Sequence, residues 1–167
     1  MEAAAIHERL SARFGENVTA FEAAAKQPWA VVAAAAIAEV AAFCKADPAL
    51  AFDNLLCLSA VDYPKENPPR MDVVYHLFSY KHRHYIVLKV NAPRDNPVVP
   101  TVENVWKAAN WLEREIYDLL GIVFTGHPDL RRLLMPEDWP GHPLRKDFVE
   151  PAEYHGISTS RESLLKA

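Results

Sequence analysis

Residue types that can carry chemistry gather in the last third of the chain. His127 and His142 lie 15 positions apart, each is followed by a proline, and neither has a cysteine nearby. A protein zinc site usually takes three or four ligands at short, regular spacings. This pair of histidines therefore does not match a metal site.

Three carboxylates in the same region, Asp118, Asp129 and Asp138, have the chemistry of general acids or bases. No second group pairs with any of them at a defined spacing, as a catalytic dyad would require. The chain also lacks a GxGxxG fingerprint, a Walker A loop and a GxSxG elbow. We therefore expect no catalytic, cofactor-binding or metal-ligating residues here. An enzyme built on the two histidines and these carboxylates remains an alternative.

The positions of the remaining cysteines and histidines that could bind a metal indicate structural or solvent-exposed roles. Cys44 and Cys57 form no CxxC pair and have apolar neighbours, which predicts buried, reduced thiols. His82 and His84 lie in a polar connection, which predicts a solvated hairpin.

Charge and hydropathy limit the classes of partner. The formal net charge of −4 and a pI near 6.0 argue against nucleic-acid binding. The longest apolar run, residues 29–38, is far shorter than the roughly 20 residues of a membrane span. The first residues lack the apolar core of a signal peptide. We expect a cytosolic chain without a transmembrane segment, which reaches a membrane only through a partner.

The last third of the chain follows a region in which both helical and strand-like hydrophobic patterns occur. Residues 71–80 have apolar side chains on both faces, which predicts a central strand or one covered on both sides. Together with residues 85–90 they are predicted to form an antiparallel hairpin. The full set of predicted elements is helices over 2–14, 35–45 and 101–120, and strands over 18–21, 29–32, 55–61, 71–80 and 85–90.

The predicted helix over 101–120 begins with Thr101 as its cap and ends at Gly121. Its apolar stripe consists of Val105, Ala109, Leu112, Ile116 and Leu119. Its opposite face carries Lys107, Trp111, Arg114, Glu115 and Asp118. That face is either solvated, with a routine Arg114–Asp118 pair, or an interface anchored by Trp111. Both interpretations stay open.

Beyond Gly126 the periodicity ends, and prolines at 128, 136, 140, 143 and 151 block a regular helix or an interior strand. Arginine suits docking because its fork binds carboxylates in a bidentate manner. We predict a domain over 1–125 and an extended proline-rich arm over 126–167 that docks on a partner. The side chains expected at the partner interface are Trp111, Arg114, Glu115, Asp118, His127, Arg131, Arg132, Trp139, His142, Arg145, Lys146 and Asp147.

The same stretch resembles a known family. The segments 113–115 (ERE), 117–122 (YDLLGI), 126–132 (GHPDLRR), 134–139 (LMPEDW) and 141–147 (GHPLRKD) are similar to the signature of the 30-kDa-type subunit of NADH-quinone oxidoreductase, which is respiratory complex I. Residues 59–64 and 74–77 also look like strand segments of that family. The resemblance runs from about Val31 to Glu150.

The resemblance implies an α+β fold, with a two-layer domain in which a mixed β-sheet packs against helices, plus an extended C-terminal arm. It implies a non-catalytic structural subunit in the hydrophilic arm of a proton-translocating NADH:quinone oxidoreductase. Its partners would be the quinone-site subunit, which is the 49-kDa-type subunit, and other hydrophilic-arm subunits.

The resemblance further implies that this chain binds no cofactor, whereas the complex uses NADH, FMN, iron–sulfur clusters and quinone. The chain would lie peripherally on the cytoplasmic side of the inner (plasma) membrane. Two alternatives remain: the equivalent scaffold subunit of a membrane-bound hydrogenase or ferredoxin-linked dehydrogenase, and a free-standing adaptor unrelated to respiration.

Overall fold

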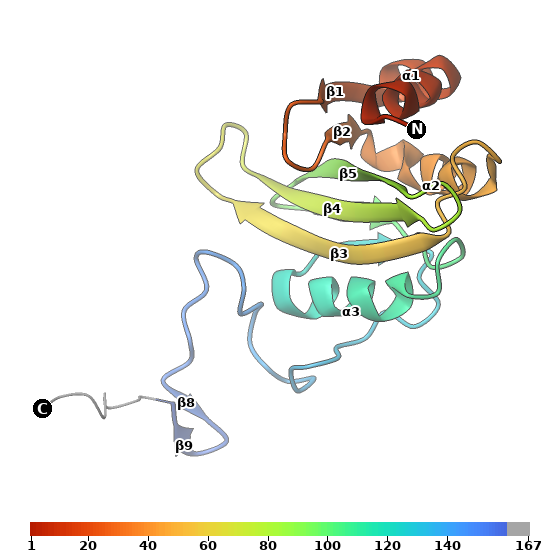
Figure 1. The fold of residues 1–167 in the computed structure, drawn as a ribbon. Helices are drawn as coiled ribbons and strands as arrows, with labels where there is room; N and C mark the ends of the chain where they lie inside the picture. Colours follow the sequence, from red (N-terminus) through yellow and green to blue (C-terminus); the bar gives the residue numbers. More distant parts are fainter. Residues whose placement is uncertain (160–167) are drawn as a thin grey trace, which may run out of the picture.

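The structure, a computed structural model, describes residues 1–159, in which three helices pack against a five-stranded sheet (Figure 1). The helices are α1 (Ala3–Phe14), α2 (Ile37–Ala46) and α3 (Ala109–Leu120), with 3₁₀ turns at Gly15–Asn17 and Ala34–Ala36. The strands are β1 (Val18–Glu22), β2 (Trp29–Val32), β3 (Asn54–Tyr63), β4 (Arg70–Ser79), β5 (His84–Pro93), β6 (Val98–Pro100), β7 (Val123–Thr125), β8 (Glu153–Tyr154) and β9 (Ile157–Ser158).

The main sheet has the strand order β1-β2-β5-β4-β3. The β1/β2, β3/β4 and β4/β5 pairs are antiparallel, and β2/β5 is parallel, so the sheet is mixed. β4 and β5 are paired along their whole length, which confirms the predicted hairpin. The strands β3, β4 and β5 make up the long half of the sheet, with β3 at its edge.

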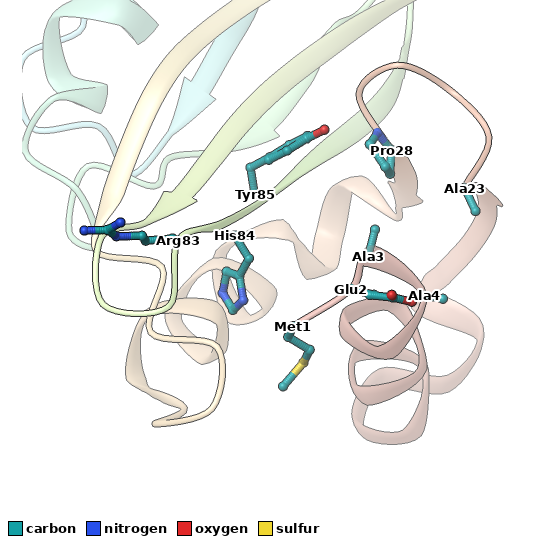
Figure 2. A pocket seen from close by; sticks show the side chains of 9 residues that line it. All are labelled: Met1, Glu2, Ala3, Ala4, Ala23, Pro28, Arg83, His84 and Tyr85. Carbon is teal, nitrogen blue, oxygen red and sulfur yellow. The ribbon is translucent and has the colours of Figure 1, made fainter.

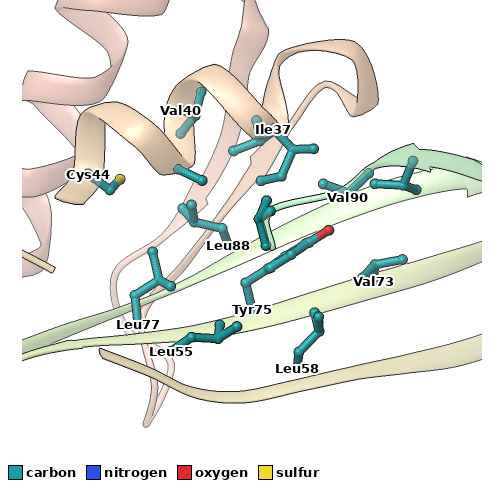
Figure 3. Packing of buried hydrophobic residues seen from close by; sticks show 14 of the residues in the cluster. Ile37, Val40, Cys44, Leu55, Leu58, Val73, Tyr75, Leu77, Leu88 and Val90 are labelled. Carbon is teal, nitrogen blue, oxygen red and sulfur yellow. The ribbon is translucent and has the colours of Figure 1, made fainter. Parts of the chain in front are cut away.

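The core lies between one face of this sheet and the helices. Because side chains alternate along a strand, Tyr75, Leu77, Leu88 and Val90 share a face and are buried there. They meet α2 residues that recur at helical spacing, including Val40 (Figure 3). α1 and α3 bury their own apolar residues in the same cluster. The predicted two-layer α+β fold is confirmed.

The region before α3 differs from the prediction. α3 begins at Ala109, so the expected helix from Thr101 is wrong. The Thr101 hydroxyl donates to Glu113 and accepts a bond of 3.1 Å from the Glu103 backbone N–H, so Thr101 does not cap the helix. β6 and β7, one on each side of α3 in the chain, form a parallel pair. Strands of three residues are too short to produce a recognisable alternation in sequence.

Two of the smaller predictions need correction. Cys44 is buried as expected, and burial raises the pKa of its thiol to about 12. Cys57 is exposed, since it follows a β-bulge that shifts the register of β3. His84 is only 4 % exposed and donates to the Leu50 carbonyl at 2.7 Å, so it does not belong to a solvated hairpin. Over residues 1–159, none of the helices has the length and hydropathy to span a bilayer.

Candidate docking arm and its anchorage on α3

The arm is joined to α3 through the carboxylate of Asp118, which is fully buried. Its Oδ2 accepts hydrogen bonds from the backbone N–H groups of Leu133, Leu134 and Met135 at 3.0, 2.7 and 2.8 Å. Its Oδ1 lies 3.0 Å from Nη1 of Arg132. Burial alone would raise the pKa of Asp118, but these four donors together hold it below its usual value. The start of the arm is thus folded around one anion.

Arg132 also closes the next turn of the arm. Its Nη2 donates to the carbonyls of Trp139 and Gly141 at 3.0 and 3.2 Å. One guanidinium therefore joins α3 to two parts of the arm. This is the fixed, multi-donor geometry for which arginine is suited and lysine is not.

Arg114 holds the arm from one turn earlier on α3. It is 6 % exposed, and it donates to the carbonyls of Arg131 and Arg132 at 3.2 and 3.3 Å. Its guanidinium carbon lies 5.2 Å from the centre of the Trp111 ring. Of the two interpretations left open for this face, the solvated Arg114–Asp118 pair is wrong, since both side chains contact the arm instead.

The C-terminal end of α3 is capped by the arm. The carbonyls of residues 118, 119 and 120 accept from His142 Nδ1 at 2.9 Å, from the Leu144 N–H at 2.9 Å and from Arg145 Nε at 2.7 Å. Helix ends leave such carbonyls without internal partners. Gly121 lies directly beneath these groups with φ +75°, and a Cβ there would come 2.5 Å from His142 Nε2. This close approach requires glycine.

A second anchor joins the arm to the edge strand of the sheet. Asp62 on β3 accepts two bonds from Arg94, at 2.7 and 2.9 Å, and one from the Lys146 N–H at 2.9 Å. Arg94 also contacts Asp147 at 2.6 Å. Hydrogen bonding to Arg94 is the main reason that the pKa of Asp62 is lowered. The 142–147 segment is therefore bound to both α3 and β3.

A third buried carboxylate, Glu113, secures the approach to α3. It is 0 % exposed and accepts from the Thr101 hydroxyl and, at 2.8 Å, from the Val102 N–H. Burial raises its pKa to about 7. Glu113 was not among the functional residues predicted from the sequence. The sequence feature that could have identified Glu113 as buried is its helical spacing: it lies four positions after Ala109 and three before Ile116, both of which are buried.

The residues predicted to meet a partner divide into two groups. Trp111, at 62 % exposed, faces solvent, as do the others in the first group: Glu115, Arg131, Lys146 and Asp147. The second group makes contacts within the chain, with Arg114 and Asp118 buried and with His127, Arg132, Trp139, His142 and Arg145 half-buried. Four strongly exposed apolar side chains of the arm were not singled out: Leu134 (61 %), Leu144 (57 %), Val149 (84 %) and Ile157 (71 %).

The histidines of the arm take structural hydrogen bonds. His127 Nε2 donates to the Asn110 carbonyl at 3.1 Å, and its Nδ1 accepts from the Asp129 N–H at 3.0 Å. Asp138 accepts from Tyr154 and His155 of the β8–β9 hairpin, each at 2.7 Å. Within the described part of the chain, no group of three or more His, Cys, Asp or Glu residues is arranged to hold a metal ion.

A hollow of about 370 Å³ lies where the first residues of α1 meet the β4–β5 turn, away from the arm (Figure 2). His84 lines it, and its Nδ1 is buried without a partner. Burial is the main cause that lowers the pKa of His84. The other residues that line it are Met1, Glu2, Ala3, Ala4, Ala23, Pro28, Arg83 and Tyr85, and no Ser, Thr or Cys nucleophile is among them.

The chain has clear relatives. It matches the family model described as respiratory-chain NADH dehydrogenase, 30 Kd subunit, over residues 30–154. It is 42% identical over 158 residues to the C-type subunit of NADH-quinone oxidoreductase from Chlorobium phaeobacteroides, covering 93% of this chain and 94% of the relative. It is 53% identical over 117 residues to the same-named protein of Roseiflexus castenholzii, covering 70% and 67%.

Two solved structures share the fold. A trypsin-resistant fragment of Nqo5 (1-134) superposes with a TM-score of 0.64 and 34% identity, covering 78% of this chain and 100% of the fragment. A chain of the membrane-bound sulfane sulfur reductase, an archaeal respiratory membrane complex, superposes with a TM-score of 0.69 at 22% identity, covering 89% and 86%. The second likeness concerns the fold alone.

Proposed function

Since the chain belongs to the family of the 30-kDa subunit of respiratory-chain NADH dehydrogenase, we propose that it is a structural subunit of the hydrophilic arm of a proton-translocating NADH:quinone oxidoreductase. In this proposal it carries no catalytic residue and binds no cofactor. It supports the quinone-site subunit of the 49-kDa type. NADH, FMN, iron–sulfur clusters and quinone are used by the complex as a whole, on the cytoplasmic side of the membrane.

The observation that carries this proposal is the division of the arm into two sides. The inner side is bound to α3 and β3 through the buried carboxylates of Asp118 and Asp62. The outer side presents Leu134, Leu144 and Val149 to solvent. Exposed apolar side chains on a segment held so firmly are typical of a protein–protein contact. An arm needed only to complete the fold would have little reason to expose them.

The supporting role follows from rigidity. The arm has no regular secondary structure over 126–152, yet its backbone is tied at residues 132–135 and 142–146. Because this backbone is already ordered, it loses little conformational entropy when a partner binds to it. A partner seated on it would be held in one position, which suits a subunit that keeps a redox centre and a quinone pocket at a constant separation.

The equivalent subunit of a related membrane-bound hydrogenase or ferredoxin-linked dehydrogenase is the second candidate. The fold it shares with a chain of the sulfane sulfur reductase complex is compatible with that role. The companions of the chain separate the two candidates. A flavin-binding, NADH-oxidising subunit in the purified complex supports the first, and its replacement by a hydrogenase or ferredoxin-linked module supports the second.

The deciding experiment is affinity purification of the tagged full chain from detergent-solubilised native membranes. We expect the quinone-site subunit and NADH:quinone reductase activity to co-purify. Leu144→Asp combined with Val149→Asp is expected to remove the quinone-site subunit from the eluate, whereas Ala12→Asp on the exposed side of α1 is expected to retain it. A wild-type chain that purifies alone would disprove the proposal.

A further inference from the structure

One face of the main sheet is left uncovered by the helices of residues 1–159, all three of which bury their apolar residues in the core on the other side. Strand register identifies the side chains on this uncovered face. Val74 lies beside Lys89, and Phe78 lies beside Tyr85. We call it the open face and define it by Trp29, Val61, Val74, Phe78, Tyr85 and Lys89.

The composition of the open face is unlike that of a solvated sheet. An antiparallel sheet with one wet face normally alternates apolar and polar residues. Here Val61 is 37 % exposed and Tyr85 is 43 % exposed, while Val74 and Phe78 are half-buried. Apolar residues such as these are the reason that the pattern over 71–80 predicts a strand covered on both sides. Residues 1–159 cover only one of those sides.

The open face also contains a hollow. A hollow of about 320 Å³ lies over β3, β4 and β5, and Leu56, His76, Phe78 and Tyr85 line it. Leu56, at 55 % exposed, forms part of its rim. A recess of this size, with mostly apolar walls, fits one large apolar side chain from another protein.

The charge on this face indicates the partner. Lys89 is half-buried with its Nζ 3.9 Å from the centre of the Trp29 ring, and no carboxylate of residues 1–159 forms an ion pair with it. Arg70, on the same side of β4 as Val74, is paired with Asp72 at 2.9 Å. A second copy of this chain docked about a two-fold axis here would bring Lys89 close to its own counterpart. A different protein with a carboxylate would neutralise it.

We propose that the open face is a second docking surface, separate from the arm, for a neighbouring subunit that places an apolar side chain in the hollow and a carboxylate on Lys89. The inference rests on the proposed function only in requiring a multi-subunit complex. It adds a second contact, so that the chain is held between two neighbours or between two parts of one neighbour.

Cys57 provides a built-in reporter, because it is exposed and lies beside His76 on this face, while Cys44 is fully buried. The test is alkylation by N-ethylmaleimide, followed by mass spectrometry, in the native complex and in the separately purified full chain. We expect Cys57 to react at least about tenfold more slowly in the complex, because docking excludes the reagent. Cys44 should react in neither until denaturant is added. Equal rates for Cys57 would overturn the proposal.

The carboxylate is tested by carbodiimide treatment of the native complex, which joins a lysine to a carboxylate in direct contact. We expect an amide from Lys89 to an Asp or Glu of a different subunit. Lys89→Glu should lower occupancy of that subunit by about tenfold or more, while Lys89→Arg keeps the cation and should retain it. A crosslink between two copies of this chain, or none from Lys89, would overturn the proposal. If companions co-purify but Cys57 stays equally reactive, the proposed function stands and this inference fails.

Discussion

Asp118 and Arg132 form the contact that starts the arm: a fully buried carboxylate on α3 and a guanidinium 14 residues later, with 3.0 Å between Oδ1 and Nη1. The contact joins α3 to the first turn of the arm. Each satisfies the other, and the three backbone N–H groups after Arg132 complete the shell around Asp118. Removing the Arg132 guanidinium would leave the buried Asp118 carboxylate without its ion-pair partner.

Asp118→Asn is therefore expected to release the start of the arm. The amide has one acceptor oxygen, so its NH₂ group would face either the backbone donors or the Arg132 guanidinium. The free energy of unfolding should fall by about 3 kcal/mol, in the range measured for breaking a buried ion pair. Limited trypsin digestion measures the release, because the protease cuts after Arg131 and Arg132 once that backbone is free. We expect faster cleavage at both positions. Glu115→Gln, on the exposed side of the same helix, is the matched control, and equal cleavage of the two variants would contradict the anchor role.

Gly121→Ala should displace the cap of α3. A methyl group there would collide with His142 and Arg145 at 2.5–2.7 Å, in addition to the strain of φ +75°. Gly156 has a similar φ of +76°, and a Cβ added there would have nothing within 4 Å. Any loss in Gly156→Ala would therefore come from backbone strain without a collision. We expect a larger loss of melting temperature for Gly121→Ala than for Gly156→Ala. Similar losses would mean that the arm does not press on the helix end.

The pH dependence of stability should reveal Glu113. When unfolded it loses its proton near pH 4.5, whereas in the folded chain it keeps the proton up to about pH 7. Between these values the folded state holds more protons, so the free energy of unfolding should decrease as pH rises, by about 3 kcal/mol in total. Glu113→Gln should remove this decrease, as measured by urea unfolding at pH 5 and pH 8. Glu115→Gln serves as the control, and an unchanged slope in Glu113→Gln would refute the assignment.

Arg145→Ala and Trp139→Ala are expected to weaken assembly of the complex while leaving the domain folded. Arg145 bonds the last carbonyl of α3 at 2.7 Å, and Trp139 packs on Tyr154 with ring centres 4.9 Å apart, both outside the main core. Co-purification of partner subunits measures assembly, and circular dichroism of the purified chain measures folding. Arg13→Ala on α1 is the control. A variant that unfolds, or one that assembles normally, would show that these residues do not hold a docking arm.

Much of the fold was predictable because it depends on local periodicity. The alternation over 71–80 and 85–90 is visible in sequence, and both became central strands of the sheet. The α3 stripe also followed from spacing, with Ala109 and Ile116 buried as expected. The β6–β7 pair and the true start of α3 were not predictable, because three-residue strands and a turn stabilised by a distant Glu113 leave no periodic trace.

For the candidate site, the sequence by itself determined which residues matter: a dense set of Arg, His, Asp and Trp without catalytic pairing, placed on a helix and a proline-rich arm. Only the tertiary structure decided which way each one faces. Arg114 and Asp118 lie on the polar side of the helix wheel, yet they are buried because the arm folds back over that side. A helix wheel describes one helix in isolation, whereas burial depends on segments that return to it from elsewhere in the chain.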